Sequence, residues 1–265
     1  MVRQAFYPLY ERAVQTPEVH ADFFAQVHRE LADGREARSL REDFSGTFLV
    51  SCAWVKGTGD RTALAVDLDP ECLKYGKNHH LRKLKPAERR RVRTLLADVA
   101  TVTAPVDVAA ACNFSFFCLT EWDHLVRYFE CAKRSLKKGG MLVLEVGGGP
   151  GMTQKITETR RLRLADGTRF TYYWDQKSFD PVSHLGRFAI HFKTADGEMH
   201  RDVFAYRWRL WSIPELRAAL KQAGFASSHI YWEERTEDNK LTGEYVLSSR
   251  GENDHSWVSY VVGVR

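Results

Sequence analysis

The sequence predicts an α/β protein built on a doubly wound, mostly parallel sheet of seven strands, and three observations lead to this prediction. Strand-like and helix-like segments alternate over residues 39–146. The last strand-like segment of this series, 141–146, is almost continuously apolar, as is typical of a strand buried on both faces of a parallel sheet. Two strand-like segments near 226–233 and 257–264 follow a final helix and close the chain.

The expected elements follow in order along the chain. Residues 1–38 have apolar positions at helical spacing and a stop signal at Gly34, which predicts an N-terminal helical cap before the first strand. The core of the fold is expected in residues 39–148 and 211–265. Its strands before the final helix are expected near 39–43, 62–67, 92–97, 106–112 and 141–146, and its helices near 47–56, 71–84 and 121–136.

Residues 149–210 interrupt this alternation. Strand-like runs in this segment are separated by turn signals such as Ala165-Asp166-Gly167, which is the pattern of an antiparallel meander. We therefore expect an inserted antiparallel β lid on the substrate side of the core. Ser212 and Glu215 then form a capping box at the start of a helix that Gly224 ends.

Composition narrows the class of protein. The chain has 265 residues, 44% of them hydrophobic, and no apolar run approaches the roughly 20 residues that cross a bilayer. The N-terminus lacks an apolar segment followed by a small-residue cleavage site, so we expect no signal peptide, no membrane anchor and a cytoplasmic protein. The net charge of +5 permits an anionic partner without requiring one.

The spacing of the cysteine and histidine residues does not match that of metal-binding motifs. None of the five cysteines belongs to a CxxC pair, and no HxxxH or His/Cys cluster has metal-ligand spacing. We expect no disulfide framework, no zinc site and no metal dependence.

The most informative motif is an acidic residue that follows a glycine turn. Asp67 ends the second strand, 21 residues after Gly46 in the turn after the first. A βαβ unit uses an acid at about this distance to bind the two hydroxyls of a nucleoside ribose. The turn lacks the three-glycine spacing of a dinucleotide site, which favours a cofactor with ribose and adenine but no pyrophosphate. S-adenosylmethionine fits this description. The neighbouring Asp69 precedes Pro70 and is interpreted as a helix N-cap.

From here the ordered series of motifs resembles the class I (seven-stranded, Rossmann-like) S-adenosylmethionine-dependent methyltransferases of the small-molecule type. The series comprises the loop 42–47, Asp67 after the second strand, Asp98 after the third, Asn113 after the fourth and Gly139-Gly140 before the fifth. The resemblance covers residues 39–146 and the chain from Ser212 onward. It implies the same fold, in which the two strands after the final helix form a C-terminal antiparallel hairpin. It also implies S-adenosylmethionine as cofactor and methyl transfer as the reaction.

The resemblance also implies roles for single residues. Asp67 would bind the ribose hydroxyls, and Leu68 would pack on the adenine. Asp98 would accept from the adenine amino group beside the backbone of Val99. The methionine arm near the methyl group would be lined by Asn113 and Phe114, with the aromatic face close to the sulfonium.

The first loop departs from the family pattern. Phe44 and Phe48 stand where the family commonly has glycines. Either Glu42 or Asp43 faces the ammonium group of the cofactor, with Glu42 favoured by alignment, and Arg41 is a candidate partner for its carboxylate. The other expected cofactor contacts are Ser45, Gly46 and Thr47 from this loop and Tyr10 from the N-terminal cap.

Aromatic residues in the expected lid indicate an acceptor pocket. Tyr172, Trp174 and Trp208 share parity along their strands, so they are candidates, with Phe117, to line an apolar or aromatic pocket above the methyl group. No catalytic residue can be assigned from the sequence. The candidates for a general base are His184, His191 and Tyr172.

The leading hypothesis is therefore a methyltransferase that acts on oxygen or nitrogen of a small-molecule acceptor. A second hypothesis is an RNA methyltransferase that uses the basic residues of 82–93, although no aromatic residues interleave with them and a solvated helix face explains the run as well. A third is a non-catalytic, cofactor-binding regulatory protein. The sequence leaves the oligomeric state open.

Overall fold

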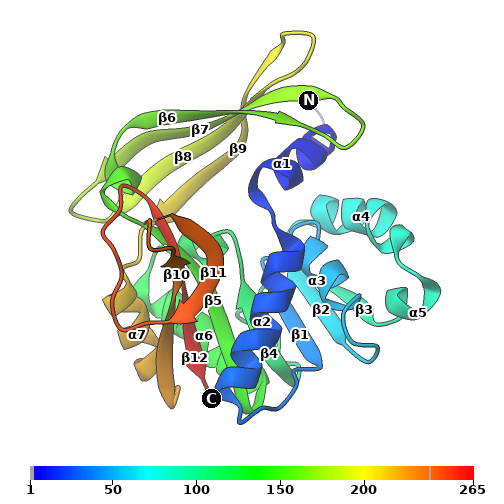
Figure 1. Cartoon of the computed structure of the whole chain (residues 1–265), viewed down its shortest axis with the longest axis vertical. Coiled ribbons are helices and arrows are strands. Elements are labelled where there is room, and N and C mark those ends of the chain that lie inside the picture. The colour runs from blue at the N-terminus through cyan, green and yellow to red at the C-terminus, as the bar shows by residue number, and fades with distance from the viewer. Residues whose placement is uncertain (1–2, 239) are drawn as a thin grey trace.

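The structure is a computed structural model that describes residues 3–238 and 240–265. Its larger sheet has eight strands over these residues, in the order β11-β10-β12-β5-β4-β1-β2-β3 (Figure 1). Strands β1 to β5 run parallel, whereas β12, β10 and β11 are antiparallel. The predicted fold class is confirmed. The strands are β1 (Ser39–Asp43), β2 (Thr62–Asp67), β3 (Val92–Leu96), β4 (Val106–Ala111), β5 (Leu136–Gly148), β10 (Ser227–Arg235), β11 (Leu241–Leu247) and β12 (Trp257–Val264).

One strand of this sheet was not predicted. β11 pairs with β10 at the sheet edge, so the sheet has one strand more than expected. Almost all of its residues are exposed, including Leu241 and Leu247, and Gly243 interrupts its pattern. An exposed edge strand lacks the periodic burial that identifies a strand in a sequence.

Helices cover both faces of the sheet, which makes it doubly wound. On one face α2 (Pro17–Leu31) and α3 (Leu49–Trp54) pack in a core with residues of β1, β2 and β4. On the other face α6 (Trp122–Ser135) and α7 (Ile213–Gln222) pack in a second core. The remaining helical elements are η1 (Arg3–Phe6), α1 (Tyr7–Val14), α4 (Pro70–His79), η2 (Leu81–Lys83), α5 (Pro86–Arg89), η3 (Ser115–Cys118) and η4 (Pro150–Thr153).

A separate antiparallel sheet lies between β5 and α7 in the chain. Its order is β6-β7-β8-β9, and it lies above the carboxyl ends of the parallel strands in Figure 1. Phe6, Leu9 and Ala13 of η1 and α1 pack on its inner face, whereas α2 packs on the larger sheet. The division of the chain into cap, core and lid remains a prediction. The strands are β6 (Ile156–Arg163), β7 (Arg169–Asp180), β8 (Leu185–Lys193) and β9 (Met199–Arg209).

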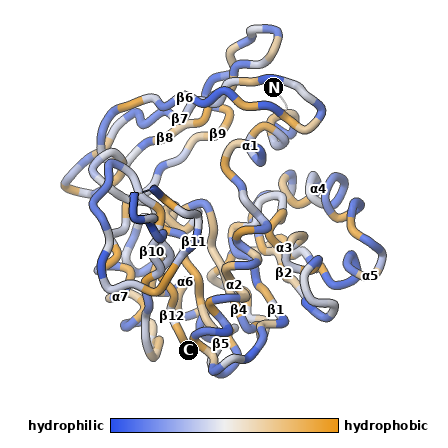
Figure 2. Tube along the Cα trace, in the orientation of Figure 1, coloured by the Kyte–Doolittle hydropathy of each residue, from blue (hydrophilic) through white to orange (hydrophobic). Residues whose placement is uncertain are grey.

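Hydropathy follows this architecture. Figure 2 shows hydrophobic residues along the central strands and hydrophilic residues along α4 and α5 at the periphery. None of the described helices is both long and apolar enough to cross a membrane.

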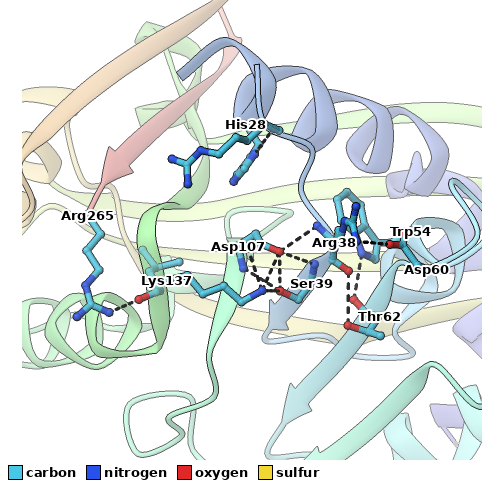
Figure 3. A network of polar contacts seen from close by, with 11 residues as sticks. His28, Arg38, Ser39, Trp54, Asp60, Thr62, Asp107, Lys137 and Arg265 are labelled. Carbon is cyan, nitrogen blue, oxygen red and sulfur yellow. Dashed lines mark hydrogen bonds and ion pairs between the residues drawn. The ribbon is translucent and has the colours of Figure 1, made fainter. Parts of the chain in front are cut away.

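The amino ends of the parallel strands are joined by one carboxylate, that of Asp107 on β4 (Figure 3). Its Oδ2 accepts from the backbone amides of Arg38 and Ser39, both at 2.9 Å, and from the Ser39 hydroxyl at 2.7 Å. Lys137 of β5 donates to it at 3.1 Å. Burial alone would raise the pKa of Asp107, but these donors outweigh it and hold the pKa below its usual value.

Candidate cofactor and acceptor site

A cavity of about 280 Å³ lies at the carboxyl ends of β1, β2 and β4, where parallel α/β sheets commonly bind ligands. Eight of the expected cofactor contacts line it: Tyr10, Glu42, Asp43, Ser45, Gly46, Thr47, Asp67 and Asn113. Its wall also includes Arg3, Tyr7, Gln15, Phe44, Asp69, Cys72, Cys112, Ser115, Cys118, Phe204, Tyr206 and Trp208.

Asp67 organises two loops at this cavity. Its Oδ2 accepts from the Gly46 amide at 2.7 Å, and its Oδ1 accepts from the Asp69 amide at 2.8 Å. Burial raises the pKa of Asp67 above its ordinary value, although the backbone amides of Gly46 and Leu68 oppose this shift. Asp69 is the N-cap of α4, as predicted, because it accepts from the amides of Glu71 at 2.8 Å and Cys72 at 3.4 Å.

The loop after β1 adopts the left-handed backbone at alternate positions. Phe44, Gly46 and Phe48 have φ values of 53°, 54° and 52°. Glycine adopts this region freely, whereas a bulky residue pays about 1–3 kcal/mol of strain. The two phenylalanines therefore hold a left-handed backbone that glycine would adopt without strain.

Packing accounts for these two phenylalanines. Phe48 is completely buried, and its ring lies against the backbone of Gly76 in α4. The Phe44 ring packs edge-on against Tyr128, with 5.4 Å between ring centroids. Buried aromatic contact can offset the backbone strain.

The two acids at the end of β1 point to opposite faces of the sheet. Glu42 is buried and accepts from the Ser51 amide in the first turn of α3 at 2.7 Å. Burial raises the pKa of Glu42 to about 7. Asp43 instead accepts from Arg41 at 2.7 Å and from Tyr128 at 2.9 Å. Of the two acids, Glu42 is the one whose carboxylate has no basic side chain bound to it.

The structure corrects the expectation for Arg41. Its guanidinium is fully buried and donates to Asp43, to the Val102 carbonyl at 2.8 Å and to the Ser135 hydroxyl at 2.7 Å. Arg41 does not line the cavity. Arg41 lies on the same face of the sheet as Asp43 but two positions before the end of β1, and its hydrogen bonds to Val102 and Ser135 hold it away from the cavity.

Three residues expected near the adenine also lie outside the cavity. Leu68 is 69% exposed, Val99 is buried in the core, and Asp98 accepts from the Ala100 amide at 2.8 Å. None of the three is in the cavity wall. Their adenine contacts remain predictions.

A second cavity of about 540 Å³ lies beneath the smaller sheet. It includes the predicted acceptor residues Tyr172, Trp174 and Trp208, and also Phe114, which was expected at the cofactor. It shares Tyr10, Gln15, Asn113, Tyr206 and Trp208 with the first cavity. The other residues of its wall are Arg12, Ala13, Val14, Thr16, Glu145, Glu158, Arg160, Leu162, Ile190 and Val258.

Phe117 supports this cavity from behind. It is completely buried and does not line either cavity. Its ring packs edge-on against Trp208, with 6.0 Å between centroids. The sequence predicted that Phe117 contacts the acceptor, but its side chain lies behind the cavity wall.

The two histidines expected as bases lie elsewhere. His184 is exposed in the turn between β7 and β8. His191 pairs in register with Tyr173 on the face of the smaller sheet away from Tyr172. Its Nε2 lies 3.2 Å from Asp175, and its Nδ1 accepts from the Asp202 amide at 2.7 Å. Neither histidine lines a cavity.

Tyr172 lines the second cavity, but its ionisation is unfavourable. Burial raises the pKa of its hydroxyl to about 12. The guanidinium of Arg160 lies over its ring, 4.5 Å from the centroid. Tyr172 is therefore suited to contact with an acceptor rather than to proton removal near neutral pH.

Sequence reasoning missed Glu145 of β5. It is the one acid in the apolar run 141–146, and that isolation was the available signal. Its Oε2 accepts from the Asn113 amide at 2.6 Å and lies 3.1 Å from His20 Nε2. Arg3 and Tyr206 were also missed, because η1 and β9 approach the site only in the folded chain.

The first cavity fits a polar cofactor. Among the described residues, the buried side-chain atoms Gln15 Oε1, Ser45 Oγ and Ser115 Oγ have no hydrogen-bond partner, and all three residues line this cavity. Buried polar atoms are normally hydrogen-bonded, so unpartnered ones gathered at a cavity indicate a ligand with polar groups. Ribose, adenine and an amino-acid arm supply such groups.

Comparison with solved structures assigns the fold. The sugar N-methyltransferase KedS8 from a Streptoalloteichus species covers 100% of this chain and 93% of its own at 21% identity, with a TM-score of 0.67. DesVI of Streptomyces venezuelae covers 97% and 94% at 16% identity, with a TM-score of 0.71. CalS10 of Micromonospora echinaspora, an amino pentose methyltransferase solved with S-adenosylmethionine, covers 98% and 96% at 16% identity, also with 0.71.

The chain therefore has the fold of the class I S-adenosylmethionine-dependent methyltransferases, as the sequence motifs implied. No family model matches the chain, and no curated protein matches it.

Proposed function

We propose that this protein is an S-adenosylmethionine-dependent methyltransferase that methylates a nitrogen atom of a small, sugar-like acceptor. One observation carries the proposal: the cavity at the carboxyl ends of the strands and the aromatic cavity beneath the smaller sheet share five wall residues. Two ligands bound there would meet at Tyr10, Asn113 and Trp208. That arrangement suits direct transfer of a group from one ligand to the other.

The first cavity is assigned to the cofactor. Asp67 and the loop 44–48 would bind the ribose, and Glu42 would face the ammonium of the methionine arm. Gln15, Ser45 and Ser115 have unpartnered polar atoms that can bind the rest of the molecule. When bound, the cofactor supplies an electrophilic methyl group on a sulfonium.

The second cavity is assigned to the acceptor. Tyr172, Trp174 and Trp208 offer aromatic faces of the kind that stack on sugar rings, and Arg160 and Glu145 add charged groups. Two of the solved structures with this fold are described as sugar-modifying methyltransferases, one of them N-specific. The enclosing sheet would hold the acceptor nitrogen in line with the methyl group and exclude water.

The first test is calorimetry with S-adenosylmethionine and S-adenosylhomocysteine. We expect a stoichiometric complex with each, and no binding at millimolar cofactor by folded protein would contradict the proposal. The second test incubates the protein with labelled cofactor and a metabolite extract. We expect label on an amine-containing small molecule, whereas label on RNA or on a hydroxyl would replace the proposed acceptor class.

The structure offers little support for RNA as the acceptor. The guanidinium groups of Arg89 and Arg91 donate to backbone carbonyls, among them that of Arg61 at 2.6 Å. These two arginines stabilise the turns around α5 and are less free to bind phosphates. A regulatory protein without catalysis would bind cofactor but label no acceptor in the extract.

A further inference from the structure

The acceptor cavity contains an acid that is held by a buried histidine. Glu145 on β5 lines this cavity. His20 approaches Glu145 from α2, the helix that packs on the larger sheet. The two side chains are 11% and 3% exposed, with 3.1 Å between His20 Nε2 and Glu145 Oε2. The Asn113 amide also donates to Oε2, at 2.6 Å. Both contacts use the same oxygen, so neither occupies Oε1.

The surroundings keep this pair charged. Burial alone would raise the pKa of Glu145, but His20 and the Asn113 amide outweigh it and lower the pKa below its ordinary value. Burial alone would lower the pKa of His20, but Glu145 raises it overall. Both shifts favour the charged forms of the pair, a carboxylate beside an imidazolium.

Other titratable groups also face Glu145. The thiol of Cys112, the imidazole of His20 and the carboxylate of Glu145 have atoms within 4.8 Å of one another. Burial raises the pKa of the Cys112 thiol well above its usual value, so the thiol stays neutral. The phenol of Tyr260 is buried on the neighbouring strand β12, and burial likewise raises its pKa well above the usual value. The carboxyl group of Glu42 on β1 also raises the pKa of His20. Glu158 and Arg160 are the charged residues of β6 in the cavity wall.

We propose that Glu145 binds the acceptor nitrogen and that His20 is the positioning residue that fixes this carboxylate. The inference rests on the function proposed above and specifies which residue selects an amine. A carboxylate in a cavity with aromatic walls accepts hydrogen bonds from an amino group and attracts positive charge.

During methyl transfer the carboxylate of Glu145 would stabilise the positive charge that develops on the acceptor nitrogen. The lone pair of the neutral amine forms the new N–C bond, and the electron pair of the breaking C–S bond stays on sulfur. The nitrogen becomes a methylammonium and the sulfonium becomes a neutral thioether, and the nitrogen then loses a proton to solvent. Glu145 would face the nitrogen where positive charge develops, which stabilises the transition state.

The same geometry disfavours a hydroxyl acceptor. A hydroxyl must lose its proton as it attacks, which needs a base of suitable pKa. A carboxylate whose pKa lies below its ordinary value, as that of Glu145 does, is a poor base. We therefore expect discrimination in favour of the amine.

The test uses the full-length protein and a panel of amino sugars, each paired with its parent sugar, such as D-glucosamine with D-glucose. Binding is measured by calorimetry on protein saturated with S-adenosylhomocysteine, and turnover is measured with labelled S-adenosylmethionine. For the wild type we expect at least one amine to bind about tenfold or more tightly than its hydroxyl partner. A panel without any such preference overturns the proposal.

Glu145→Gln should abolish this preference and lower kcat/KM for the amine by about 10²-fold or more. Cofactor affinity should stay within about threefold, which shows that the variant is folded; Glu145→Asp, which keeps the charge, should recover part of the activity. Asp175→Asn is the matched control, because it removes the carboxylate of another buried histidine pair outside both cavities. Its kinetics should match the wild type.

His20→Gln tests the positioning role through the pH profile. Without the imidazolium the pKa of Glu145 rises, so the acidic limb of kcat/KM should move to higher pH by about one unit. An unmoved limb in a folded, cofactor-binding variant overturns the role of His20. If Glu145→Gln keeps full amine turnover, this inference fails while the proposed function stands; if the wild type does not bind cofactor, the proposed function itself fails.

Discussion

The ring of Phe48 lies so close to Gly76 that a β-carbon at position 76 would come within 2.3 Å of Phe48 Cε1. The same β-carbon would lie 2.4 Å from the carbonyl oxygen of Thr47. The cofactor loop and helix α4 are therefore matched to each other, because a bulky residue in the loop requires the smallest residue in the helix.

Gly76→Ala should destabilise the protein by about 1–3 kcal/mol, because the added methyl group overpacks this contact. Urea unfolding of the single and double variants measures the effect. In the background of Phe48→Ala the cost should be smaller but still present, because the Thr47 carbonyl remains close. A Gly76→Ala variant as stable as the wild type would show that the loop adjusts without cost.

Asp67→Ala should weaken S-adenosylmethionine binding by about tenfold or more. The change removes the expected ribose ligand and also the two backbone contacts that order the loops around Gly46 and Asp69. Calorimetry provides the measurement. Asp60→Ala serves as a control, because Asp60 forms an exposed pair with Arg38 outside both cavities, and equal affinities for the two variants would contradict the assignment.

Asp43→Asn should lower the free energy of unfolding by about 3–5 kcal/mol, because it leaves the Arg41 guanidinium buried without its counter-charge. Replacing both residues, as in Arg41→Met with Asp43→Leu, should cost much less than the sum of the single changes. Chemical unfolding of the wild type, Arg41→Met, Asp43→Leu and the double variant forms a double-mutant cycle. Additive costs would show that the two side chains do not act as a pair.

Glu42 should make the ligand-free protein less stable as the pH rises. Its pKa is raised by burial from 4.5 to about 7, so between these values the native state binds more protons than the unfolded state. Stability falls across that interval, by about 3 kcal/mol in total, and the contribution is constant above pH 7.

Glu42→Gln removes this dependence and keeps the acceptor oxygen for the Ser51 amide. The stability of the variant relative to the wild type should therefore rise between pH 4.5 and 7. Unfolding curves measured at several pH values, without cofactor, test this. A difference that does not change with pH would mean that Glu42 titrates normally.

The sequence was informative where a residue's role depends on its place along one strand or loop. Asp67 lies at the predicted cavity because a strand end and its turn are local features. Tyr172, Trp174 and Trp208 lie together because β7 and β9 both pair with β8, and their parity along these strands fixes a common face.

It was uninformative where a role depends on elements distant in the chain. His191 was predicted as a candidate base, but the register of β7 and β8 turns it to the outer face. Arg41 was misjudged because its partners Val102 and Ser135 come from segments 61 and 94 residues away. The importance of Glu145 emerged only when α2 brought His20 beside it.

The left-handed turn at Phe44 and Phe48 also bears on how such proteins are recognised. A glycine-rich motif in a sequence indicates backbone positions with positive φ, because glycine adopts such angles most easily. Other residues can also occupy such positions when packing stabilises them. In this chain Phe44 and Phe48 adopt left-handed torsion angles without being glycine. Proteins with this turn will therefore be found more reliably by comparing backbone torsion angles than by comparing residue letters.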